Sequence, residues 1–259
     1  MTIVNIENLM LPYEECRKAM NTWTECLSSF PEIKKRIPTN YVFGLSKETL
    51  EWMRNVGGKS PEFCAAIGVF QDQIILILYP LSDSGKRIEE REYPYSFLSE
   101  LKEDLKLQEI QEYTIVKNAV LSKDLEQIDR DDNMAFPISN KPILEQDTAL
   151  DSIEKWRNEG MDWFYRECGI EKGAGIFKKF YVPTDDLCLS DEGLEGIICS
   201  FGLKYNDIYG KMLVTLIFIS FHENLQNSGR AETISNTYDW AKPCPPICRL
   251  PDDGVGCEF

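Results

Sequence analysis

The sequence predicts an α+β fold in which antiparallel β-hairpins form one or more sheets that pack against helices. Apolar residues recur at helical spacing over 14–30 and 148–167. Two other stretches, 63–81 and 197–221, each contain two apolar runs separated by a short polar turn. The 259 residues are 43% hydrophobic and 27% charged, which is typical of a chain that folds nearly throughout.

Two helices are predicted near the start of the chain. Over 14–30 the apolar residues, Trp23 among them, lie on one helical face, and we expect Pro31 to close this segment. A shorter helix is predicted over 47–55, because Ser46 is a favourable N-cap residue.

A β-hairpin is predicted next, over 63–70 and 73–81, with Gln71 and Asp72 at the turn. Its second strand is almost continuously apolar, so we expect it to be covered on both faces. Helical spacing returns over 95–107, and 112–121 has the pattern of a strand. The polar, turn-rich residues 129–142 are the best candidate for a linker.

The second half repeats this order of elements. A helix is predicted over 148–167, a strand over 176–182, and a short helix capped by Ser190. A second apolar hairpin follows over 197–205 and 210–221, with its turn through the Asn and Asp that follow Tyr205.

An internal duplication with pseudo-twofold symmetry would explain this repeated order. LSKETLEW at 45–52 and LSDEGLEG at 189–196 agree at five of eight positions. The halves would be 1–135 and 142–259, with the cleft between them as the default pocket. Alternatively, the chain is one continuous domain that reuses common parts.

The charge and the apolar runs exclude some classes of partner. A net charge of -15 disfavours nucleic-acid binding and favours a basic protein partner. The longest apolar run, 212–221, is about half of the roughly 20 residues that span a bilayer, so we expect no membrane insertion. The start of the chain has no pattern of a secretory signal, and nine scattered cysteines favour a reducing compartment. We therefore expect a cytoplasmic protein.

Two short motifs resemble known ligand loops without matching them. VGGKSPE, at 56–62, lacks the earlier glycine of a phosphate-binding loop, since Met53 stands there. DRDDN, at 129–133, has the first spacings of a calcium loop, but Met134 replaces its glycine and Asn140 its glutamate. Neither motif predicts a cofactor.

The C-terminal stretch CPPICRLPDDGVGC, at 244–257, is open to several interpretations. Zinc would need Cys244, Cys248 and Cys257 with His222 as a distant fourth ligand, at spacings that zinc sites do not favour. Redox chemistry normally uses C-x-x-C at a helix start, which prolines disfavour here. A Cys244–Cys248 or Cys248–Cys257 disulfide is a further alternative, but a Pro-rich strap over the body is preferred, with no metal.

Four aromatic residues follow the two hairpins and could form a recognition surface: Tyr93, Tyr95, Tyr238 and Trp240. The competing interpretation places them at the edge of the core. Without a catalytic motif, the sequence favours a binding or protein-interaction module, which could form a homodimer. The alternative is a hydrolase or transferase that uses carboxylates, or a cysteine paired with His222, in the cleft between the halves.

Overall fold

A computed structural model describes residues 8–58, 60–100, 114–121, 128–135, 146–184, 194–223, 233–238 and 241–248. Four helices lie within this part of the chain: α1 (Tyr13–Cys26), α2 (Phe30–Arg36), α3 (Lys47–Gly57) and α4 (Gln146–Glu171). The strands are β1 (Leu9–Pro12), β2 (Tyr41–Leu45), β3 (Glu62–Phe70), β4 (Gln73–Pro80), β5 (Glu92–Glu100), β6 (Thr114–Leu121), β7 (Ile128–Ala135), β8 (Lys179–Pro183), β9 (Leu194–Asn206), β10 (Lys211–Glu223), β11 (Thr233–Tyr238) and β12 (Lys242–Cys244). The mixed content confirms an α+β protein.

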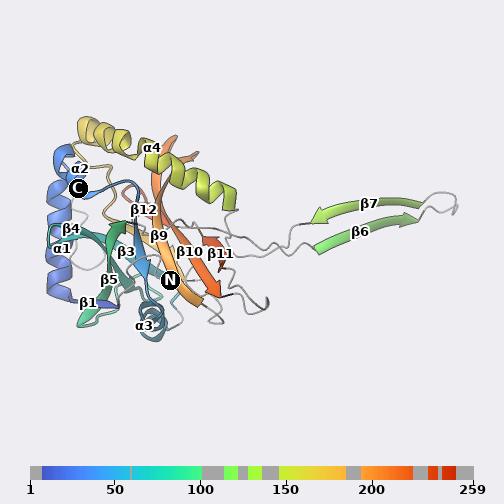
Figure 1. Ribbon diagram of the computed structural model, residues 1–259, viewed down its shortest axis with the longest axis horizontal. Coiled ribbons are helices and arrows are strands. Elements are labelled where there is room, and N and C mark those ends of the chain that lie inside the picture. Colours follow the sequence, from blue (N-terminus) through green and yellow to red (C-terminus); the bar gives the residue numbers. More distant parts are fainter. Residues whose placement is uncertain are drawn as a thin grey trace.

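The described strands build one large antiparallel sheet (Figure 1). Its ten strands follow the order β11-β10-β9-β2-β5-β4-β3-β8-β12, and β1 pairs beside β5. The sheet curls so far that β12 approaches β10. There the Thr215 hydroxyl donates a hydrogen bond of 3.2 Å to the carbonyl of Ala241. The result is a nearly closed, barrel-like sheet.

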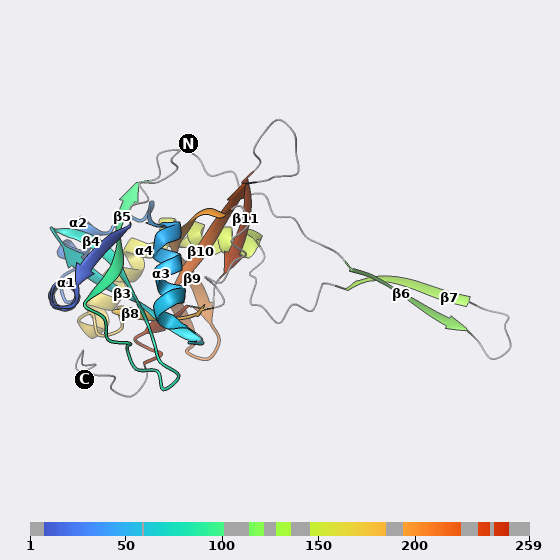
Figure 2. The ribbon, with the colours of Figure 1, turned by 90° about the horizontal axis from the view of Figure 1, so that it is seen from below.

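Helices cover this sheet on different sides, as the two ribbon views show (Figures 1 and 2). α1 packs against β3, α4 crosses β9, and α3 contacts β4 and β9. The closest helix–strand approach that involves a glycine is between α1 and β3, where a Cβ on Gly68 would lie 2.9 Å from the Cβ of Ala19. A side chain at position 68 would therefore push the helix away.

The hairpin β3–β4 is buried on both faces, as its composition predicts. On one face, alternate side chains such as Ile67 and Leu76 join a large core with residues of α2, α3, α4 and β9. On the other face, Cys64, Ile75 and their neighbours form a second core under α1. Because strand side chains alternate, one apolar strand can serve both cores.

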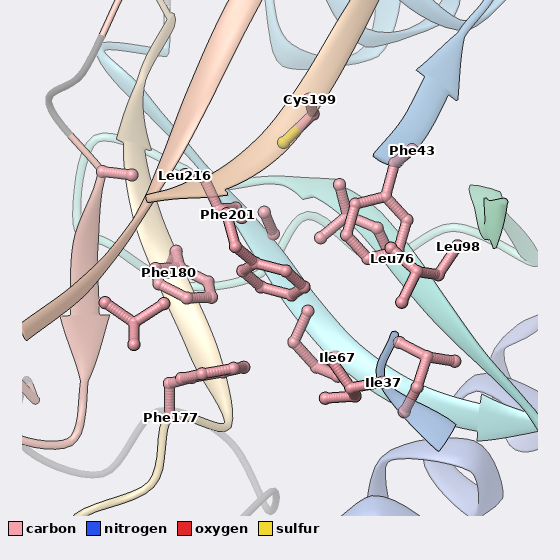
Figure 3. Close-up of a cluster of buried hydrophobic side chains, with 14 of the residues drawn as sticks. Ile37, Phe43, Ile67, Leu76, Leu98, Phe177, Phe180, Cys199, Phe201 and Leu216 are labelled. Atoms are coloured by element: carbon pink, nitrogen blue, oxygen red, sulfur yellow. The ribbon is translucent and has the colours of Figure 1, made fainter. Parts of the chain in front are cut away.

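Aromatic rings fill much of the larger core (Figure 3). Phe201 of β9 lies at its centre, with ring centroids 5.0 Å from Trp156, 5.3 Å from Phe177 and 5.5 Å from Phe43. These rings come from α4, from β2 and β9, and from the segment before β8. Their packing therefore joins parts of the chain that lie far apart in sequence.

Polar contacts orient two of the helices. The Ser46 side chain accepts a hydrogen bond of 3.1 Å from the backbone N–H of Thr49, which confirms the predicted N-cap of α3. α2 is held to the turn between β3 and β4 by Asp72, which pairs with Lys35 at 2.8 Å and with Arg36 at 2.7 Å. The hydrogen bond from Lys35 is the main reason why the pKa of Asp72 is lowered.

Two expected helical segments have other structures. The helix expected over 95–107 is wrong for 95–100, which belongs to β5. Tyr93, Tyr95 and Phe97 alternate along this segment, and strand pairing with β1, β2 and β4 outweighs the helical spacing. Pro31 does not end the first helical region, because it occupies the first turn of α2, where a proline fits.

The prediction of a short helix capped by Ser190 is wrong for the residues of it that the structure describes. Residues 194–196 belong to β9, extended by pairing with the equally long β10, and residues 185–193 lie outside the described part. The predicted linker 129–142 is wrong for 129–135, which forms most of β7 and pairs with β6. Both ribbon views show β6 and β7 standing clear of the large sheet (Figures 1 and 2).

The described residues show no internal duplication. The repeat needed a short helix after Ser46 and a matching one after Ser190. Among the described residues, only the first of these two helices is present, as α3. Strands of both predicted halves are neighbours in the sheet, since β2 pairs with β9 and β3 pairs with β8. The curved sheet is thus a shared structure of the regions 1–135 and 142–259.

We expect Gly68→Val to lower the free energy of unfolding by about 1–3 kcal/mol, because the new side chain would clash with Ala19 and with Ile75. Chemical denaturation would measure it. Gly169→Ala in α4 is the matched control: its Cβ would meet nothing within 4 Å, so it should be neutral or stabilise by up to about 1 kcal/mol. Equal effects of the two variants would contradict this account of the α1–β3 contact.

Candidate functional site

The turn between β9 and β10 is a well-supported projection of the sheet. The two strands pair along nearly their whole length, from Lys211 opposite Asn206 to His222 opposite Leu194. In the turn, the Asn206 side-chain oxygen accepts hydrogen bonds from the backbone N–H groups of Ile208 and Tyr209, each 3.1 Å long. Gly210 has a φ of 61°, which a glycine adopts without strain. Local hydrogen bonds therefore fix the turn.

Three apolar side chains of this turn face solvent, and we call them the apolar tip: Tyr205, Ile208 and Tyr209. Their exposed fractions are 60%, 88% and 43%. They lie within five consecutive residues, whereas single exposed apolar residues are ordinary on protein surfaces. Such a contiguous group is typical of an interaction site.

The apolar tip was missed at the sequence level, where the residues between the strands 197–205 and 210–221 predicted only a turn. The available signal was the composition of YNDIYG, because a turn needs Asn and Gly but has no structural use for two tyrosines and an isoleucine. The exposure of these residues depends on where the neighbouring strands and helices end. That information comes from the tertiary structure alone.

Tyr93, one of the four aromatic residues predicted to form a recognition surface, is buried and hydrogen-bonded within the protein. It is 1% exposed, and its hydroxyl donates to the carbonyl of Ile88 at 2.7 Å and accepts from the N–H of Glu90 at 2.9 Å. Arg87 also hydrogen-bonds this hydroxyl, while its guanidinium lies 3.9 Å above the ring of Tyr13. These contacts anchor the segment between β4 and β5.

Tyr95 lies closer to the surface than Tyr93. It is partly buried and packs with two other partly buried rings, with centroids 5.4 Å from Phe97 and 5.9 Å from Phe70. Tyr238 is the last residue of β11, opposite Phe218, and Trp240 lies outside the described residues. A shared surface of all four predicted aromatic residues stays a prediction.

Residues 242–248 lie on the body of the protein, and the rest of the C-terminal stretch lies outside the described residues. β12 pairs with β8, the N–H of Lys178 donates to the carbonyl of Cys244 at 2.8 Å, and Cys244 is joined to Cys248 by a disulfide. This is the first of the two disulfides that the sequence left open. Sulfur atoms in a disulfide are not available as thiolate ligands for zinc.

The other two members of the weak zinc alternative cannot be placed around that disulfide. Cys257 lies outside the described part, and only the backbone of His222 is described, in β10 opposite Leu194. Among the residues that the structure describes, no three His, Cys, Asp or Glu side chains gather closely enough to hold a metal ion. In the same residues, no helix has the length and apolarity needed to cross a membrane.

Burial makes four of the five free thiols among the described residues poor nucleophiles. It is the main cause that raises the pKa of Cys16 to about 12 and the pKa of Cys199 well above its ordinary value. The pKa values of Cys26 and Cys168 are raised for the same reason, though both are less buried. The thiolate is the nucleophilic form of cysteine, so none of these four side chains is a good nucleophile at neutral pH.

Comparison with known proteins gives no family for this chain. No family model matches it, and no curated protein or solved structure is significantly similar to it. A functional interpretation therefore depends on the surface chemistry of the described residues, in which the apolar tip is the most distinctive feature.

We expect Cys16 and Cys199 to resist alkylation by iodoacetamide in the native protein at pH 7.5, because their raised pKa values leave almost no thiolate. Mass spectrometry of digested protein would locate the modified residues. Protein unfolded in urea is the control, in which both should react. Rapid native modification of Cys16 would show that it is reactive after all.

We expect Cys248→Ser to lower the free energy of unfolding by about 2 kcal/mol, the entropy of closing so short a loop. The disulfide encloses a sequence separation of only 4 residues. Urea denaturation would measure the loss, and adding a reductant should destabilise the original protein but leave the variant unchanged. A destabilisation of the variant by reductant would point to another disulfide.

Proposed function

We propose that this protein is a binding module that contacts a partner protein through the apolar tip. The exposure of Tyr205, Ile208 and Tyr209 on a fixed turn carries this proposal. Tyrosine gives a large contact area with few rotatable bonds, so it is frequent among residues that dominate binding energy. The long β9–β10 hairpin supports the proposal, because a turn whose backbone is already ordered loses little conformational entropy on binding.

A basic protein is the partner that the charge favours. The net charge of -15 would attract a positively charged surface at long range and speed the encounter. The apolar tip would then supply the short-range contact, since burial of apolar side chains stabilises a complex without needing charge. The same charge would repel a nucleic-acid backbone.

The other expectations stay proposals of lower rank. A homodimer would use the same apolar tip on both copies. An internal duplication has support only from the repeated order of sequence elements. A cytoplasmic address is opposed by the Cys244–Cys248 disulfide, because oxidising compartments favour such bonds. The hydrolase or transferase alternative gains no support from the described thiols, whose pKa values are raised.

We expect Ile208→Ser to weaken partner binding at least about tenfold, because the most exposed apolar side chain of the tip would be lost. Affinity capture from an extract of the source cells, followed by mass spectrometry, would find basic proteins retained by the original chain. Purified candidates would then be titrated calorimetrically. The variant should keep the original stability within about 0.5 kcal/mol.

Ile170→Ser is the matched control, since Ile170 is 78% exposed and belongs to α4, not to the apolar tip. It should bind like the original protein. Sedimentation equilibrium would report self-association in the same three proteins. Equal partner binding and equal self-association in both variants would refute a role for the apolar tip.

A further inference from the structure

Residues 241–248 close the curled sheet, and we call them the seam segment. On one side, its strand β12 pairs with β8. On the other side, the carbonyl of Ala241 accepts the 3.2 Å hydrogen bond from the hydroxyl of Thr215 in β10. The seam segment therefore connects β8 to β10, and its attachment determines whether the barrel-like sheet is closed.

Few hydrogen bonds attach the seam segment to β8. β12 is only three residues long, and its middle residue, Pro243, has no backbone N–H to donate. At its end, the N–H of Lys178 donates a hydrogen bond of 2.8 Å to the carbonyl of Cys244. A short strand of this kind belongs to the part of a fold that opens locally, at a lower free energy than the core.

The Cys244–Cys248 disulfide restrains the turn that follows β12. The N–H of Ile247 donates to the carbonyl of Pro243 at 2.9 Å, and the disulfide spans the same turn at a sequence separation of 4. The closed loop limits the conformations that the segment gains when it leaves β8. For so short a loop, this entropy favours the attached state about 30-fold over the same segment with two free thiols.

The two sulfur atoms of this disulfide differ in access from solvent. Cys244 is fully buried and belongs to the core under α1, whereas Cys248 is exposed. Thiol–disulfide exchange requires that a thiolate reaches one of the two sulfur atoms. A small thiol can therefore attack Cys248 while the seam segment is still attached to β8.

We propose that the Cys244–Cys248 disulfide is a redox-sensitive switch, which a small monothiol opens in the folded protein and which controls the attachment of the seam segment. The thiolate attacks the Sγ of Cys248, the bond between the protein sulfurs breaks, and Cys244 leaves as a thiolate that takes up a proton. A second monothiol attacks the sulfur of the first and releases Cys248 as a thiol. Two monothiols are thus oxidised to one disulfide, and the protein disulfide is reduced to two thiols.

This switch goes beyond the proposed function and does not depend on the apolar tip. The protein would respond to the thiol–disulfide balance of its surroundings through one segment, while the rest of the sheet stays folded. The switch needs no prepared nucleophile in the protein, because the attacking thiolate belongs to the monothiol.

Glutathione is the probe that tests the chemistry. The intact, folded protein is incubated at pH 7.5 with increasing ratios of reduced to oxidised glutathione, quenched with acid, alkylated and digested for mass spectrometry. We expect Cys244 and Cys248 to become alkylated together as the ratio rises, and the trapped mixed disulfide to lie on Cys248. A disulfide that opens only in urea, or glutathione trapped on Cys244 instead, would overturn the proposal.

Amide hydrogen exchange measured by NMR tests the attachment. The N–H of Lys178 should exchange about 30-fold faster in the reduced protein than in the oxidised protein. Low urea should not change this rate, because local opening exposes little surface. The N–H of Ile67 is the reference: it donates at 2.9 Å to the carbonyl of the same Lys178, on the β3 side of β8, and should exchange only through urea-sensitive unfolding.

Two variants complete the test. Cys248→Ser should show the fast Lys178 exchange without any reductant and should not respond to glutathione. Cys168→Ser, which removes a partly exposed free thiol of α4, is the matched control and should behave like the original protein. Ile208→Ser should leave the switch unchanged, so its failure is distinguishable from failure of the apolar tip. Slow Lys178 exchange in Cys248→Ser, or the same urea dependence for Lys178 and Ile67, would refute a locally opening seam segment.

Discussion

Burial of the β3–β4 hairpin on both faces is the constraint on which the rest of the structure depends. Ile67 and Leu76 belong to one core, while Cys64 and Ile75 belong to the other. A strand pair that is apolar on both sides is stable only when each side is covered. α1 therefore packs closely on one face, and the curled sheet with α2, α3 and α4 encloses the other. The absence of a side chain at Gly68 allows the first of these contacts.

The strand pairing that encloses these cores also positions the surface proposed for recognition. The β9–β10 turn carries the apolar tip at the end of two long paired strands, and their pairing holds its backbone in place. Binding through this tip needs neither a metal nor a reactive thiol, and the pKa values of Cys16, Cys26, Cys168 and Cys199 are all raised.

The acidic character of the chain would act mainly on the encounter with a partner. At the apolar tip, the net charge of -15 would affect the rate of encounter more than the strength of the final contact, because the tip residues themselves are uncharged. Added salt should consequently slow the approach of a basic protein partner.

The sequence by itself determined the α+β class, the N-cap at Ser46 and the first apolar hairpin, because these depend on local patterns of capping and alternation. It also indicated the second hairpin. It did not determine the structures of 95–100 and 194–196, where pairing with distant strands outweighed helical spacing, nor the separate environments of Tyr93 and Tyr95. The apolar tip was decided only by the tertiary structure. The exposure of its side chains depends on which strands end beside each other, and strand order is a property of long-range packing that no local pattern encodes.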